Sequence, residues 1–247
     1  MKRLHILIII LSFITFFSSA EPYCDVRKFS ILDGLAANSI SDLAQGYDKM
    51  MWFGTWNGLS YYDGYHFKTF RDEPDSIDVM STNRILSIFP SPDNNVWVVT
   101  FDLKLYIFDT HRCQFLNTGK KLNERFNIQL RASQIYPLKN GHTWITTQND
   151  KYLIRIGQGD DLDSMKPELI KVGQKGLRSG KIWFIKQDKK GREWILTDKG
   201  TMIYGSHFST PIPFKWFREV GNTIFLATTD GKVAVYDEQN HLTMVPM

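Results

Sequence analysis

Cysteine is scarce in this sequence. The 247 residues contain only Cys24 and Cys113, and two cysteines have no spacing that indicates a disulfide framework. An exported protein would permit a disulfide between them, but we expect two unpaired thiols. The six histidines are scattered one at a time, without the spacing of metal ligands. Because no arginine, tyrosine and glutamate set stands out as a catalytic centre either, the sequence predicts no catalytic residue, no metal and no cofactor.

Strong charge and a membrane span are also absent. Residues 1–20 combine Lys2 and Arg3 with an apolar run and the small residues Ser18-Ser19-Ala20, a pattern typical of a secretory signal peptide. The run is shorter than the roughly 20 residues that cross a bilayer, and no later stretch approaches that length. Without this segment, 28 basic residues balance 26 acidic ones, which argues against a nucleic-acid partner. We therefore expect an exported, periplasmic protein.

What the sequence does contain is a repeat. A bulky aromatic residue sits inside five short β-prone runs, each of which ends in threonine. The anchors are Trp52, Trp97, Trp144, Trp194 and Phe225. Their spacings of 45, 47, 50 and 31 residues are close to one propeller blade of about 40 to 50 residues, apart from the short last interval.

The same parts recur around each anchor. Turn-forming residues precede it, as in Asp93-Asn94-Asn95, and a second apolar strand ends ten to twelve residues after it. Turns such as Asn57-Gly58 and Asp230-Gly231 between the two strands are typical of β-hairpins. One further strand on each side gives four antiparallel strands per unit, and such units bury their faces by stacking around an axis. The anchors are then expected between blades.

The sequence thus predicts an all-β fold, a β-propeller segment of about five four-stranded antiparallel blades that is incomplete and therefore open. The predicted segments are a signal peptide at 1–20, an N-terminal strand at 21–38 that would complete the last blade of a full propeller, and blades at 39–72, 83–117, 133–173, 181–212 and 214–247. The strand at 21–38 lacks its own hairpin, and His241 to Val245 already supplies an outer strand for the fifth blade. We therefore expect its partner blade beyond Met247, in a longer parent protein.

The first blade resembles the two-component regulator propeller family. The resemblance rests on Asp33-Gly34-Leu35, Asn38-Ser39-Ile40, Trp52-Phe53-Gly54-Thr55, Gly58-Leu59 and Tyr62-Asp63-Gly64. It weakens along the chain, where Arg155 replaces the usual aspartate of the third blade. The resemblance implies the periplasmic sensor part of a regulator, with further blades, a membrane-bound histidine kinase in the parent protein and commonly a ligand derived from carbohydrate. A homodimer is a further expectation.

The candidate ligand site lies on the turns between the two central strands and on the loops between blades, which emerge at one end of a propeller. The candidate residues are Trp56, Asn57, Arg84, Phe101, Asp102, Gln148, Asn149, Asp198 and Lys199. An aromatic ring beside amides and carboxylates can stack on a sugar while its neighbours bond the hydroxyls. For Trp56 the alternative is packing against a neighbouring blade, and for the others it is an ordinary turn role.

Three functions remain open from the sequence. The first is a ligand-sensing region that passes a glycan or other periplasmic signal to a kinase outside this chain. The second is a secreted scaffold that binds a protein through the same face. The third is a propeller enzyme that cleaves glycans, for which the residues offer no catalytic set.

Overall fold

The computed structural model describes residues 25–71, 80–159 and 162–246. Almost every regular element in these ranges is a β-strand. The predicted signal peptide and Cys24 lie outside the described residues, whereas Cys113 is an exposed free thiol.

The strands form five four-stranded antiparallel sheets, each built from consecutive strands. The first sheet holds β1 (Ile40–Gln45), β2 (Met51–Thr55), β3 (Gly58–Tyr62) and β4 (Phe67–Phe70). The second holds β5 (Ile85–Pro90), β6 (Val96–Thr100), β7 (Leu105–Asp109) and β8 (Gln114–Leu116). The third holds β9 (Ala132–Pro137), β10 (Thr143–Thr147), β11 (Tyr152–Ile156) and β12 (Glu168–Lys171).

The last two sheets follow the same plan. The fourth holds β13 (Ile182–Gln187), β14 (Glu193–Thr197), β15 (Gly200–Ile203) and β16 (Ser209–Thr210). The fifth holds β17 (Phe214–Val220), β18 (Thr223–Thr228), β19 (Val233–Tyr236) and β20 (Leu242–Met244). The first strands of successive sheets contact one another, β1 with β5 and β5 with β9, so these are the inner strands. Strand β9 begins one residue before the expected third segment.

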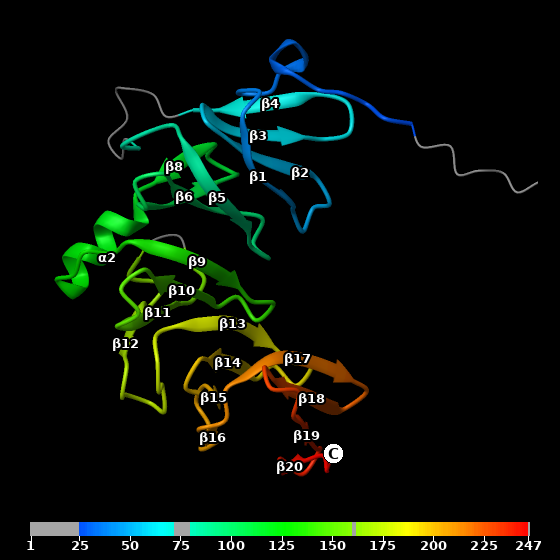
Figure 1. Cartoon of the computed structure of the whole chain (residues 1–247). Helices are drawn as coiled ribbons and strands as arrows, with labels where there is room; N and C mark the ends of the chain where they lie inside the picture. Colours follow the sequence, from blue (N-terminus) through cyan, green and yellow to red (C-terminus); the bar gives the residue numbers. More distant parts are fainter. Residues whose placement is uncertain (1–24, 72–79, 160–161, 247) are drawn as a thin grey trace, which may run out of the picture.

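The sheets stack face to face from the first at one end to the fifth at the other (Figure 1). No strand joins the first sheet to the fifth within the described ranges. The predicted fold class, an open all-β propeller segment of five blades, is thereby confirmed.

Apolar clusters fill the spaces between successive blades, and each anchor points toward the blade that follows it. Trp52 packs with Ile88 and Phe108 of the second blade, and Trp194 packs with Phe214 and Tyr236 of the fifth. The four tryptophan anchors are at most 4% exposed. Phe225 holds the same position in the fifth blade but is 39% exposed, because no blade covers that face here.

The threonine that ends each anchor run holds the turn that follows. All five are buried: Thr55, Thr100, Thr147, Thr197 and Thr228. In the first and fourth blades the hydroxyl donates to a backbone carbonyl at the start of the next strand, Thr55 to Gly58 at 2.8 Å and Thr197 to Gly200 at 2.8 Å. In the other three blades the hydroxyl donates to a side chain of the turn itself, Asp102, Asn149 or Asp230. The hydroxyl therefore reinforces the tight turn that follows the strand.

A buried ionic cluster joins the third and fourth blades. The Glu193 carboxylate accepts hydrogen bonds from the Trp144 indole at 2.8 Å, from the Asn140 amide at 2.8 Å and from two Arg155 nitrogens at 2.9 and 2.8 Å. Arg155, which departs from the repeat pattern, is thus the partner of a carboxylate that is 5% exposed. A paired and fully bonded carboxylate is the form in which a buried charge is tolerated.

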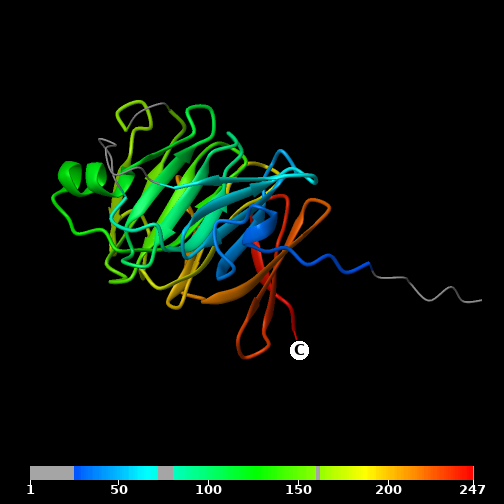
Figure 2. The ribbon, with the colours of Figure 1, turned by 90° about the horizontal axis from the view of Figure 1, so that it is seen from above.

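Two regions differ from the expected strands. Residues 25–38 contain no strand; their one regular element is the 3-10 helix η1 (Ile31–Asp33), and Val26 is 82% exposed. No strand pairs with this segment among the described residues, so its place in a last blade stays a prediction. Helix α2 (Thr118–Phe126) lies between the second and third blades and stands beside the stack (Figures 1 and 2). The sequence did not predict this helix. No helix of the described residues has the length and apolarity to cross a membrane.

Candidate functional site

Backbone hydrogen bonds place the central turns and the interblade loops at the same end of the blades. Trp56 donates to the carbonyl of Ser39, Phe101 to Arg84, Gln148 to Arg131 and Asp198 to Lys181. Each bond ties the turn after the second strand to the residue just before the inner strand of the same blade. The candidate residues therefore lie at one end of the molecule, which we call the turn face.

Three of the candidates meet across the first blade boundary and form what we call the Trp56 cluster: Trp56, Arg84 and Phe101. The two rings lie edge to face with their centroids 5.8 Å apart. The Arg84 guanidinium lies 4.4 Å from the Trp56 centroid and 5.4 Å from that of Phe101. Attraction between a cation and the ring faces holds all three in place.

The Trp56 cluster remains open to solvent. Trp56 is 47% exposed and Phe101 is 42% exposed, so about half of each ring is available to a ligand. The contact between Trp56 and Phe101 of the neighbouring blade also explains why a tryptophan occupies a tight turn. The packing alternative considered from the sequence thus agrees with the contact to Phe101, and a ligand-binding role of Trp56 stays a prediction.

Asp102 and Asn57 stand beside this cluster, Asp102 with its carboxylate engaged and Asn57 with its backbone groups engaged. The Asp102 carboxylate accepts hydrogen bonds from the hydroxyls of Ser81 and Thr100, both at 2.6 Å, and lies 3.2 Å from the Lys104 ammonium. Partial burial would raise the pKa of Asp102, but these partners outweigh it and lower the pKa below its ordinary value. The Asn57 carbonyl accepts from Arg71 at 2.8 Å.

The remaining candidates belong to the third and fourth blades. Asn149 accepts hydrogen bonds from Thr147 and Lys151, as a turn residue does, and Gln148 lies 3.5 Å from the Arg131 guanidinium. The amide of Lys199 donates to Thr197. In Asp198, the Oδ1 atom is buried and has no hydrogen-bond partner in the described part of the chain. Among the described residues no contact joins these side chains to the Trp56 cluster, so the nine candidates do not form one site.

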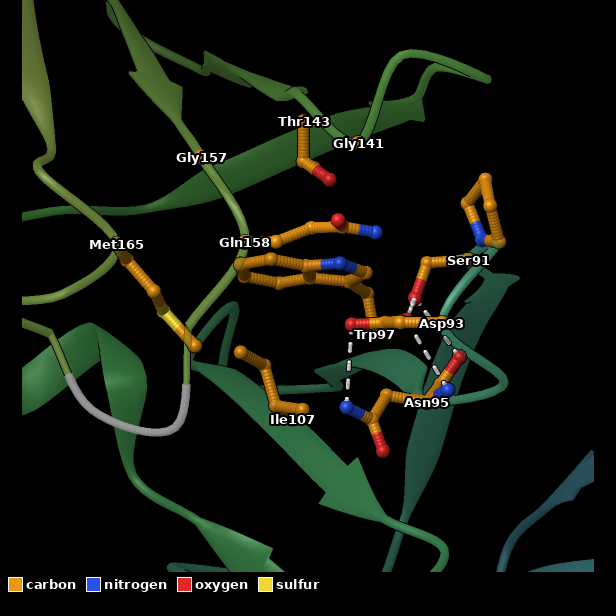
Figure 3. A pocket seen from close by; sticks show the side chains of 11 residues that line it. Ser91, Asp93, Asn95, Trp97, Ile107, Gly141, Thr143, Gly157, Gln158 and Met165 are labelled. Atoms are coloured by element: carbon orange, nitrogen blue, oxygen red, sulfur yellow. Dashed lines mark hydrogen bonds between the residues drawn. The ribbon is translucent and has the colours of Figure 1, made fainter.

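The tight packing between the second and third blades leaves little internal space. Figure 3 shows a cavity between the second and third blades, beside Trp97, Ile107 and Met165. Its volume is about 20 Å³, which is room for a water molecule but not for a sugar. Among the described residues, no group of three or more histidine, cysteine, aspartate or glutamate side chains is placed to hold a metal ion.

One aromatic and cation pair was missed from the sequence. Trp183 of β13 and Lys215 of β17 lie on inner strands, with the ammonium 6.0 Å from the ring centroid of Trp183. The site predicted from the sequence covered the turns between the central strands and not the inner strands. A tryptophan or a lysine near the start of an inner strand was the available sequence signal.

The blades, anchors and turn face together define a β-propeller of the repeat type. Residues 34–57 match the family model of the two component regulator propeller. The resemblance of the first blade to the two-component regulator propeller family is therefore confirmed. A 49-residue segment is 37% identical to histidine kinase P4 of Formosa agariphila; this segment is 20% of the chain and 4% of the relative.

The solved structure of a secretion-system component has the same fold, and a second structure shows a weaker likeness. PorZ of Porphyromonas gingivalis, a surface component of the type-IX secretion system, aligns with 85% of the chain and 33% of its own length, at 14% identity and a TM-score of 0.54. The extracellular domain of BT3049 from B. thetaiotaomicron, assigned to a hybrid two component system, aligns with 90% of the chain and 36% of its own length, at 16% identity and a TM-score of 0.45. The chain thus spans about a third of each of these proteins.

Proposed function

We propose that this chain is the ligand-sensing propeller region of a two-component regulator, which detects a carbohydrate-derived signal in the periplasm. The match of residues 34–57 to the regulator propeller repeat supports the regulatory role. The likeness to a histidine kinase supports a kinase as the output in a longer protein. Further blades, a kinase and a dimeric assembly belong to that parent protein.

The Trp56 cluster is the observation that carries ligand binding at the turn face. The cluster combines two half-exposed rings with a guanidinium and draws on two blades. Among the described residues no segment covers its exposed surface. Aromatic rings of this kind bind the apolar face of a sugar ring, and Arg84 and Asn57 supply donors for its hydroxyls. A ligand that bridges two blades would change their packing, which is a route for passing the signal on.

Calorimetry with a library of oligosaccharides tests the proposal. We expect at least one saccharide to bind the whole chain and Trp56→Ala to weaken binding about tenfold or more, the equivalent of about 1.4 kcal/mol. Trp216→Ala, at a ring that is 53% exposed away from the turn clusters of the first two blades, is the matched control and should leave this binding unchanged. Binding that survives Trp56→Ala would remove the Trp56 cluster from the site, and failure of every saccharide would overturn the carbohydrate signal.

A further inference from the structure

His142 lies at the edge of the buried ionic cluster that joins the third and fourth blades. It is the last residue before β10, and its Nδ1 atom lies 3.3 Å from Oε1 of Glu193. The Nδ1 atom is buried, yet it has no hydrogen-bond partner among the described residues. The side chain as a whole is 33% exposed, so protons from solvent reach the ring. The cluster therefore contains a titratable group that the packing of the blades leaves unbonded.

The Glu193 carboxylate has no position left for another donor. Its Oε1 atom accepts hydrogen bonds from the Asn140 amide and from Nη2 of Arg155, both at 2.8 Å. Its Oε2 atom accepts from the Trp144 indole at 2.8 Å and from Nε of Arg155 at 2.9 Å. A carboxylate offers about four acceptor positions, and a protonated imidazole donates from both of its nitrogens. A neutral His142 ring thus fits beside Glu193, whereas a protonated ring must displace an existing bond.

The charged groups that face His142 come from both blades. Among the described residues they are Glu193 of β14 and Arg155 of β11. The segment that follows β11 approaches the ring at Gly157, which carries no charge, and Glu168 of β12 acts on Arg155. Protonation of His142 therefore places a second cation beside Arg155, with Glu193 as the carboxylate that both cations face.

This environment disfavours the protonated ring. Burial lowers the pKa of His142 below its ordinary value of 6.5, and the Arg155 charge lowers it further, although the Glu193 charge opposes both. The folded chain therefore binds the His142 proton less readily than the unfolded chain does. The resulting stabilisation is complete above about pH 6.5 and is lost as pH falls through the lower, folded value.

The contact between the fourth and fifth blades has the same construction without a histidine. The buried Asp188 carboxylate accepts from the Trp194 indole at 2.8 Å and from Nε of Arg192 at 2.6 Å. Arg192 also donates to Asn240 of the fifth blade. Among the described residues no histidine forms an ion pair with Asp188. The chain therefore holds its own control for an effect of His142.

We propose that His142 is a pH-sensitive switch on the contact between the third and fourth blades. The protonated ring donates to Oε1 of Glu193 and displaces the Asn140 amide, because the bidentate Arg155 pair is the stronger of the two bonds at that atom. Asn140 then keeps its backbone bond to Gln187 of β13 at 3.0 Å, and the turn of the third blade loosens from the fourth. The switch needs no ligand and is independent of the proposed function.

Nuclear magnetic resonance of the whole chain between about pH 7.5 and about pH 5 tests the switch, because this range contains the titration of a histidine. The indole N–H of Trp144 donates to Glu193 and reports on its bonds. Its resonance should move in a step that coincides with the titration of the His142 ring and has its midpoint below the ordinary value of 6.5. The indole N–H of Trp194, which donates to Asp188, should show no step in this range.

Two variants separate the effect of His142 from that of other titrating groups. His142→Phe keeps a ring but has no donor and no charge, so it should abolish the step at Trp144. At about pH 5, the Asn140 side-chain amide should exchange with solvent about tenfold faster in wild type than in His142→Phe, because only wild type loses the bond to Glu193. His207→Gln, at an exposed histidine between β15 and β16, is the matched control and should behave as wild type.

Four results would overturn the switch. They are the absence of a step at Trp144 in wild type, an equal step at Trp194, a step at Trp144 that persists in His142→Phe, and equal exchange of the Asn140 amide in wild type and that variant. The comparison of the two indoles needs wild type alone, so the test stays decisive even where His142→Phe does not fold.

Discussion

Single side chains decide how firmly neighbouring blades are joined, and Glu193 is the strongest example. Its carboxylate receives hydrogen bonds from three residues of the preceding blade and is 5% exposed. Water cannot replace a lost partner at such a depth. The cluster thus fixes the relative placement of the third and fourth blades as well as contributing to stability.

Glu193→Gln keeps the shape of the side chain but removes its charge and puts an NH₂ group among N–H donors. We expect the free energy of unfolding to fall by about 3 kcal/mol, as for other buried pairs that lose one partner. Urea denaturation followed by tryptophan fluorescence measures the change. Glu124→Gln, on the exposed side of α2, is the control, and equal stabilities of the two variants would contradict the role given to Glu193.

The same carboxylate makes stability depend on pH. Burial by itself would raise the pKa of Glu193, but the bonds from Arg155, Asn140 and Trp144 outweigh it and hold the pKa below the ordinary value of 4.5. As pH falls, the unfolded chain therefore takes up the proton first, so the stabilisation is complete above about pH 4.5 and is lost as pH falls through the lower, folded value. Wild type should lose more stability than Glu193→Gln between about pH 6 and about pH 3. Parallel curves would show that Glu193 does not titrate in this way.

At the scale of the elements, the repeated threonine links a sequence pattern to a turn. Its hydroxyl serves both neighbours of the turn in the fourth blade, donating to the Gly200 carbonyl at 2.8 Å and accepting from the Lys199 amide at 3.2 Å. A valine of the same shape leaves both groups without this partner.

Thr197→Val should therefore lower the free energy of unfolding by about 1 to 2 kcal/mol, the range for a buried hydrogen bond that loses a partner. Thr243→Val changes the same residue type on the exposed outer strand β20 and should have an effect below about 0.5 kcal/mol. Thermal and urea unfolding of the two variants provide the comparison. A Thr197→Val protein as stable as Thr243→Val would mean that the hydroxyl is not what holds the turn.

The elements also show what the sequence could and could not predict. The sheets were predictable because anchor, threonine and turn recur at a spacing set by one blade. Helix α2 was not, since it has nine residues and falls in a loop outside the repeat. The turn face was predictable from topology, but the placement of Arg84 between two rings depends on how two blade edges meet. The β-bulges at Trp183 and Lys215 depend on the register of a partner strand, which residue types alone do not specify.

At the scale of the whole molecule, the two end blades each have one uncovered face. The fifth blade exposes Trp216, Val220 and Phe225, at 53%, 57% and 39%, and the first exposes Leu43 at 57%. In the interior of the stack the corresponding faces are apolar and buried. These two faces support the proposal that further blades complete the propeller in the parent protein.

The uncovered face of the fifth blade should make the isolated chain self-associate. Phe225→Lys combined with Val220→Lys should reduce this association, because charge disfavours contact between two apolar faces. Sedimentation velocity across a range of concentrations measures the effect. Val172→Lys, at a loop residue that is 40% exposed, should leave association unchanged, and equal association of all three proteins would place the contact elsewhere.

Because every sheet consists of strands that follow one another directly, a growing chain finishes each blade before the next begins. A blade needs only local contacts to complete its own hydrogen bonds, which favours fast folding. At each stage the newest blade presents one bare face, and the blade made after it covers that face. The bare face that is most prone to misassembly therefore moves to a later blade as synthesis proceeds. The position of a pause in translation determines which blade carries that face.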